Sequence, residues 1–115
     1  MTIQRLENGA RFCRVLTHNG TVYLAGMTAD DTSGDVVQQT HDTLAKIDHY
    51  LRMAGTDKSK LLSALIWLRD IADFDRMNSE WDRWIDRSAM PVRATVEARL
   101  AGDAYRVEIM VTAAQ

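Results

Sequence analysis

Residues 90–112 constrain the fold more strongly than any other stretch of the chain. Pro91, the only proline, fixes its own φ angle and disfavours helix at the residue before it, so a strand should begin just after it. Apolar and polar residues alternate from Val92 to Arg99, and β-branched residues recur at every second position from 107 to 111, which is the period of a strand with two unlike faces. A turn is expected between them at Ala101–Ala104. The stretch is therefore predicted to form a β-hairpin.

Charged residues interrupt both predicted strands. Glu97 and Arg99 are interpreted as solvated edge residues, because charged side chains are seldom buried without a partner. For Arg93 and Glu108 the pattern leaves both a solvated and a functional role open. A hairpin folded about residues 102–103 would pair Glu97 with Glu108 and would separate Arg93 from Glu108 by roughly 13 Å along the sheet. A substrate or a neighbouring subunit would then have to bridge the two side chains.

The rest of the chain extends this hairpin to one α+β domain, residues 1–115, with the order β-β-β-α-β-α-β-β. Asn19-Gly20 is a strong hairpin signal. The first helix has apolar residues at spacings of three and four, Ser33 or Asp35 as its cap, and Gly55 at its end. Besides the hairpin, strands are predicted at 2–6, 11–18, 21–27 and 61–68, and helices at 35–54 and 73–86.

Two features of these elements point beyond a plain core. Gly26, near the end of the third strand, indicates a bulge or the close approach of another group. The strand 61–68 is apolar on both faces apart from Ser63, yet two helices can cover only one face of such a sheet. Because monomers rarely expose so large an apolar patch, we expect the other face to be buried against further copies of the chain. The aromatic stripe of the second helix is interpreted as core.

Composition excludes several functional classes. A formal net charge of −2 gives no basic surface for nucleic acid. The chain has no signal-peptide core and no apolar run long enough for a bilayer, so a cytoplasmic protein with no membrane partner is expected. The single cysteine, Cys13, rules out an intramolecular disulfide. His41 and His49 lie eight residues apart, which does not fit a paired metal site. Neither a metal nor a cofactor is expected.

The residues also carry a family resemblance. The segments PVRATVEARL and YRVEI resemble the signature of the RidA/YjgF family, and DFDRMNSEWDRW resembles a helix of that family. Gly26 and the pair Ala54-Gly55 fit as well, and the lengths are similar to those of the short YoaB-like branch. The resemblance covers residues 11–111. It implies a chorismate-mutase-like α+β fold, in which two helices cover one face of a mixed sheet and three subunits form a trimeric barrel.

The resemblance further implies hydrolysis of reactive enamines and imines, derived from amino acids, to 2-keto acids and ammonia. Arg93 takes the place of the arginine that holds the substrate carboxylate, and Glu108 that of the glutamate that positions the attacking water. These two are the expected catalytic residues. Phe12, Ala25 and Thr95 stand where other members have tyrosine, serine and cysteine. The expected substrate-binding residues are Arg93, Asn78, Thr95, Gly26, Phe12 and Ala25.

The chemistry is consistent with these residue types. A guanidinium grips a carboxylate through two parallel hydrogen bonds, and a carboxylate can accept the proton of a water aimed at a C=N carbon. The partner is thus expected to be a small 2-imino or 2-keto acid, with self-association as a homotrimer. The alternative is a non-catalytic trimer that binds small carboxylates or a protein partner at the same intersubunit cleft. The lost tyrosine and serine favour the alternative, whereas Arg93 and Glu108 favour the enzyme.

Overall fold

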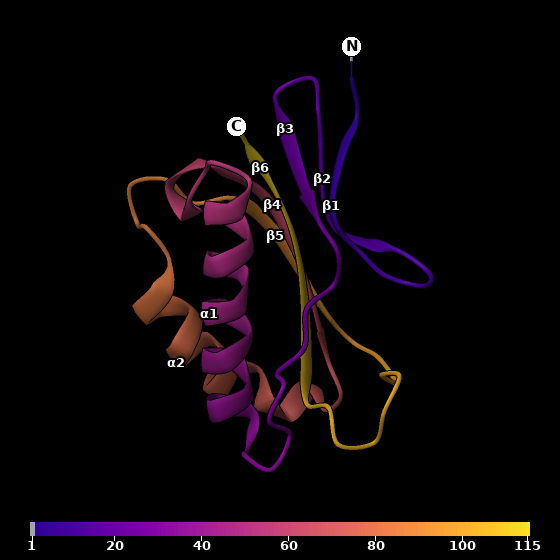
Figure 1. Ribbon diagram of the computed structural model, residues 1–115. Coiled ribbons are helices and arrows are strands. Elements are labelled where there is room, and N and C mark those ends of the chain that lie inside the picture. The colour runs from indigo at the N-terminus through magenta and orange to yellow at the C-terminus, as the bar shows by residue number, and fades with distance from the viewer. Residues whose placement is uncertain (1) are drawn as a thin grey trace.

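A computed structural model describes residues 2–115; Met1, part of the predicted domain 1–115, lies outside the described residues. The chain forms one six-stranded mixed sheet with two α-helices on one face (Figure 1). The element order β-β-β-α-β-α-β-β and the α+β class agree with the prediction. Neither helix has the length and apolar character needed to cross a membrane.

The first three strands form an antiparallel meander. They are β1 (Gln4–Asn8), β2 (Cys13–His18) and β3 (Thr21–Leu24). The turn between β2 and β3 falls at Asn19-Gly20, as predicted. Both turn residues have positive φ angles, 53° and 77°, which matches the twist that a two-residue hairpin turn requires.

Both predicted helices are present. Helix α1 (Val36–Met53) begins at Asp35, whose carboxylate accepts a hydrogen bond from the Gln38 amide, and Gly55 after its end has a φ angle of +79°. Helix α2 (Phe74–Trp84) is shorter than the predicted 73–86, because the preceding residues form a separate 3₁₀ turn, η2 (Ile71–Asp73), capped by Asp70. A similar turn, η1 (Lys58–Lys60), leads into strand β4 (Leu61–Leu68).

The predicted hairpin of residues 90–112 is wrong. Both strands exist, as β5 (Val92–Glu97) and β6 (Val107–Ala114), but the sheet order is β1-β2-β3-β6-β4-β5. Strand β4 lies between them and pairs parallel with β5 and antiparallel with β6. The cause is that β4 is the more apolar strand and belongs at the centre of the sheet, whereas Pro91 favours an edge position for β5. Glu97 and Glu108 therefore do not pair.

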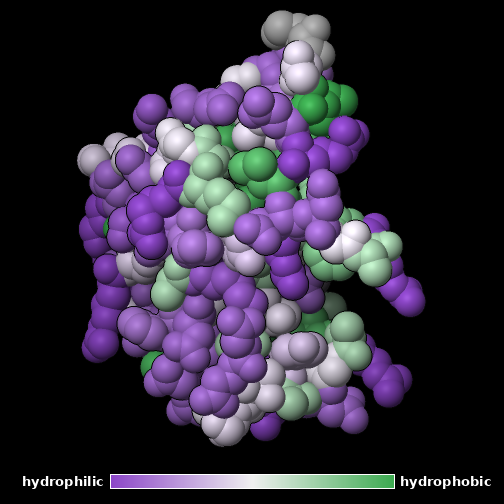
Figure 2. All heavy atoms as spheres, viewed as in Figure 1, coloured by the Kyte–Doolittle hydropathy of each residue, from purple (hydrophilic) through white to green (hydrophobic). Residues whose placement is uncertain are grey.

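The sheet has one covered face and one open face. Buried residues of β3, β4 and β6 face α1 and α2, whose outer surface is mostly hydrophilic (Figure 2). Strand β5 places polar side chains on the covered face and apolar ones on the open face. Arg93 and Thr95 point toward the helices, whereas Val92 and Val96 point away and have 74% and 51% of their surface exposed. The open face also carries other exposed apolar side chains, including Tyr23, Leu62, Leu65 and Met110.

One buried side chain ties α1 to the loop 98–106. The Gln39 amide is fully buried. Its Nε2 donates to the carbonyl oxygens of Thr32 (3.3 Å), Gly34 (3.1 Å) and Ala104 (3.0 Å), and its Oε1 accepts from the Arg106 amide at 2.8 Å. All of its hydrogen-bonding groups are thus used, and they hold the segment that leads directly into Glu108.

Candidate functional site

Arg93 is held in place by helix α2. Its Nη1 donates to Asn78 Oδ1 at 2.8 Å, and its guanidinium carbon lies 5.1 Å from the ring centre of Trp81 and 5.9 Å from that of Phe74. Partial burial lowers the pKa of the guanidinium, and the charge of Asp82 opposes that shift. An arginine nevertheless remains charged at neutral pH. The guanidinium is therefore a preset cation with donors left over for a ligand.

Residues Phe74, Asn78 and Trp81 reach Arg93 because their spacing of four and three places them on one face of α2. The sequence assigned Trp81 to the core, and its side chain is indeed buried. The role beside Arg93 was not anticipated for either aromatic residue, although the shared helical spacing with Asn78 was a usable signal. Arginine above an aromatic face is stabilised by the ring quadrupole.

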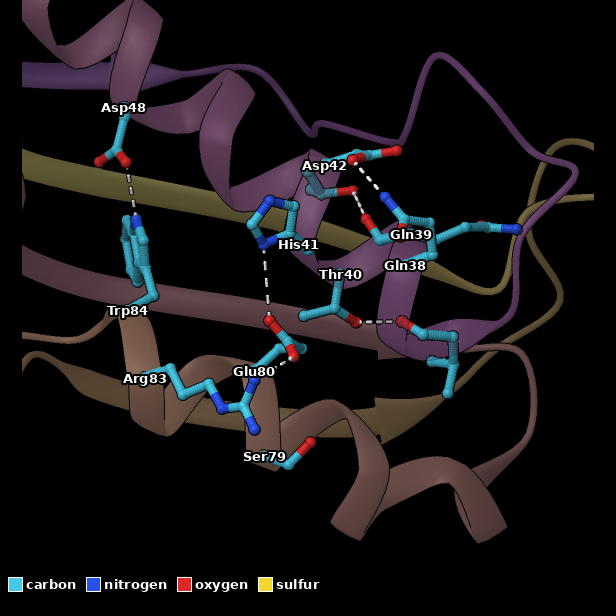
Figure 3. A network of polar contacts seen from close by, with 12 residues as sticks. Gln38, Gln39, Thr40, His41, Asp42, Asp48, Ser79, Glu80, Arg83 and Trp84 are labelled. Carbon is cyan, nitrogen blue, oxygen red and sulfur yellow. Dashed lines mark hydrogen bonds and ion pairs between the residues drawn. The ribbon is translucent and has the colours of Figure 1, made fainter.

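A polar network between the helices fixes the position of α2 (Figure 3). Glu80, almost completely buried, forms an ion pair with Arg83 at 3.6 Å, and its other carboxylate oxygen lies 3.6 Å from Nδ1 of His41 in α1. The Trp84 indole donates to Asp48 of α1 at 3.0 Å. These contacts hold the helix that carries Asn78, so they indirectly set the orientation of Arg93.

Glu108 lies on a different surface from Arg93, and the space for its carboxylate depends on Gly26. A methyl group at Gly26 would overlap the carboxylate oxygen Oε2 of Glu108 and would stand 3.2 Å from its Cδ. The close approach predicted at Gly26 is therefore confirmed, and the approaching group is Glu108. The half-buried carboxylate makes no ion pair or side-chain hydrogen bond among residues 2–115, and it shares a hollow of about 230 Å³ with Trp67, its neighbour across the sheet.

Arg93 and Glu108 lie on opposite faces of the sheet. Arg93 is in register with Ala64, which is buried on the face covered by the helices, whereas Glu108 is in register with Trp67 on the open face. Because paired residues in a sheet point to the same side, the two side chains of one chain cannot converge on a single small molecule. The structure thus gives two half-sites.

The other predicted site residues lie in different places. Thr95 accompanies Arg93 on the helix-covered side, and its buried hydroxyl has no hydrogen-bond partner in the described chain. Phe12 and Ala25 line one hollow of about 710 Å³ over β1 to β3, and this hollow also contains Met110 of β6. Residues 2–115 contain no group of three or more potential ligands that could hold a metal ion.

The comparisons with known proteins identify the relatives of this chain. The family model described as Endoribonuclease L-PSP matches residues 2–115. The RutC family protein YoaB of Escherichia coli is 43% identical over 114 residues, 99% of each chain. A 2-iminobutanoate/2-iminopropanoate deaminase of Capra hircus is 30% identical over 101 residues, 83% of this chain and 73% of the relative.

The solved structures give the same answer. The crystal structure of NMB1025 from Neisseria meningitidis, a YjgF family member, superimposes with a TM-score of 0.97 at 40% identity and covers 100% of this chain and 96% of that one. The fold, the whole-length sequence match and the family model point to one conclusion. The chain belongs to the RidA/YjgF family, within which it is similar to the RutC family proteins.

Proposed function

We propose that this protein hydrolyses reactive imines and enamines derived from amino acids to 2-keto acids and ammonia. In this reaction water adds to the C=N carbon, a proton moves to the nitrogen, and the C–N bond breaks to leave a C=O group and ammonia. Arg93 binds the substrate carboxylate, and Glu108 accepts the proton of the attacking water. The relative from Capra hircus is named as a deaminase of two such imines.

The observation that carries this proposal is the state of Glu108. A half-buried carboxylate normally has a cationic or hydrogen-bonding partner, yet none is present among the described residues. Gly26 makes room for the carboxylate. A carboxylate with this space and no partner in the described chain is available to bind and deprotonate a water molecule.

The two half-sites require a second copy of the chain, and we propose a homotrimer. The open face exposes apolar side chains from β3 to β5, and the outer edge of β5 has no strand partner in the described sheet. Packing the open face of one copy against the outer edge of β5 of the next would bury these groups, and in this arrangement Arg93 of one copy can approach Glu108 of another. Light scattering should therefore give about three times the 13.0 kDa chain mass, and a monomer at micromolar concentration would refute the shared cleft.

The decisive assay supplies 2-iminobutanoate, generated enzymatically, and follows its loss against buffer alone. Glu108→Gln keeps the size of the side chain but removes its basicity, so the rate should fall by about 10²–10⁴-fold while 2-oxobutanoate still binds. Arg93→Ala should instead abolish 2-oxobutanoate binding. Wild-type protein that hydrolyses no faster than buffer would exclude the enzyme.

A non-catalytic carboxylate-binding protein is the second candidate. It is favoured by Phe12 and Ala25, which lack the hydroxyl groups of the tyrosine and serine expected from the family. In that case Arg93→Ala would still abolish binding, and Glu108→Gln would have no rate to change. The matching family is described as Endoribonuclease L-PSP, but the net charge of −2 does not favour a nucleic-acid substrate.

A further inference from the structure

The geometry points to a substrate class for the proposed site: 2-imino acids whose side chain ends in a second carboxylate. We infer that Arg99 binds this second carboxylate while Arg93 of a neighbouring copy binds the first. The inference rests on the proposed function. It reassigns Arg99, which the sequence pattern placed with the solvated edge residues.

The hollow that contains Glu108 has a simple lining. Its six residues are Trp67, Ala98, Arg99, Leu100, Ala101 and Glu108. Four of them are tryptophan, alanine or leucine, and the only charged members are the carboxylate and the guanidinium. At about 230 Å³ the hollow is suited to a short aliphatic chain rather than to a large ring system.

Arg99 is the one cation among the six residues that line this hollow. Among residues 2–115, its guanidinium forms no ion pair or hydrogen bond, and it does not pair with Glu108 although both line the same hollow. The nearby charges are engaged elsewhere, because Arg69 pairs with Asp103 and Glu97 accepts from the Ile71 amide. Arg99 therefore presents free donors to whatever enters beside Glu108.

The order of groups along the substrate follows from these positions. The reacting carbon must lie beside Glu108, and the first carboxylate belongs to Arg93, which is on the other face of its own sheet. The remaining branch of the substrate then runs over Trp67 and Leu100 toward Arg99. A chain of about two methylene groups that ends in a carboxylate would pass these two side chains and reach the guanidinium of Arg99.

Binding of the stable 2-keto acid products tests the assignment of Arg99 directly. Calorimetry with 2-oxoglutarate and 2-oxobutanoate compares a dicarboxylate with a monocarboxylate on the wild type, on Arg99→Gln and on Arg106→Gln. Arg106 is a matched control, because it is an exposed arginine on the same loop that does not line the hollow. Both arginine side chains are exposed, so neither substitution removes a buried side-chain contact.

Arg99→Gln should weaken 2-oxoglutarate on the order of fivefold, the upper range for an exposed charge pair, and should leave 2-oxobutanoate within twofold. Arg106→Gln should change neither, and added salt should reduce the preference for the dicarboxylate. Equal losses for both acids, or no loss for either, would overturn the assignment of Arg99. If 2-oxobutanoate still binds through Arg93 in that case, only this inference fails. If the wild type binds neither acid, the carboxylate site itself is refuted.

Discussion

Gly26→Ala offers a direct test of the contact between Gly26 and Glu108. The added methyl group would meet Glu108 Oε2 and would lie 3.2 Å from Cδ, whereas comfortable contact needs about 3.5–4.0 Å. The carboxylate must therefore retreat by roughly 1 Å, and a misplacement of that size can cost about 10²-fold in rate. The backbone cost should be small, because the φ angle of Gly26 is not positive and the displaced group is the end of a flexible side chain.

Gly20→Ala is the matched control. Gly20 has a φ angle of +77° and open space around it, so an alanine there is strained by about 1 kcal/mol but touches nothing at the site. We expect Gly20→Ala to lower the melting temperature and to leave the rate of imine hydrolysis unchanged. Gly26→Ala should lower the rate of imine hydrolysis and leave the melting temperature nearly unchanged. Full activity in Gly26→Ala, with unchanged affinity for 2-oxobutanoate, would show that the position of Glu108 does not control the reaction.

Three further outcomes are expected. Gln39→Met leaves three carbonyl groups and one amide without their partner and should lower the free energy of unfolding by about 3 kcal/mol, whereas Gln38→Met on the exposed neighbouring residue should change it little in urea denaturation. Asn78→Leu removes the acceptor of Arg93 and should weaken 2-oxobutanoate by about tenfold without changing the pH dependence of hydrolysis. Hydrogen bonds from a serine hydroxyl and a backbone amide lower the pKa of three carboxyl groups, those of Asp31, Asp57 and Asp86. Their contribution to stability is present above the unfolded pKa near 3.8 and is lost as the pH falls through the lower folded pKa values. Changing all three to asparagine should therefore make the loss of stability at acid pH shallower.

Local patterns were sufficient to predict the elements but not their neighbours. The alternation after Pro91 correctly indicated a strand, yet nothing within residues 90–112 could show that β4 would insert between β5 and β6. That choice depends on which strand is apolar enough for the centre of the sheet, a comparison across distant parts of the chain. The same error concealed that Arg93 and Glu108 face opposite ways.

The site was partly predictable for a similar reason. Gly26 signalled a close approach, but only the fold identifies Glu108 as the approaching group. Gln38 and Gln39 are identical in the sequence, and tertiary contacts alone make one an exposed residue and the other a buried clamp. The family resemblance named both Arg93 and Asn78 as site residues, whereas their hydrogen bond and the aromatic surroundings of Arg93 required the structure.

The position of β6 in the sheet has a consequence for how the molecule forms. Strands β1 to β3 and the unit β4-α2-β5 are each continuous in the chain, but within the sheet they join only through β6, which pairs with β3 on one side and β4 on the other. During synthesis the two halves precede β6 and must wait for it, with their apolar edges accessible to other chains. Glu108 lies on β6, so the proposed base is positioned only when β6 pairs with both halves of the sheet.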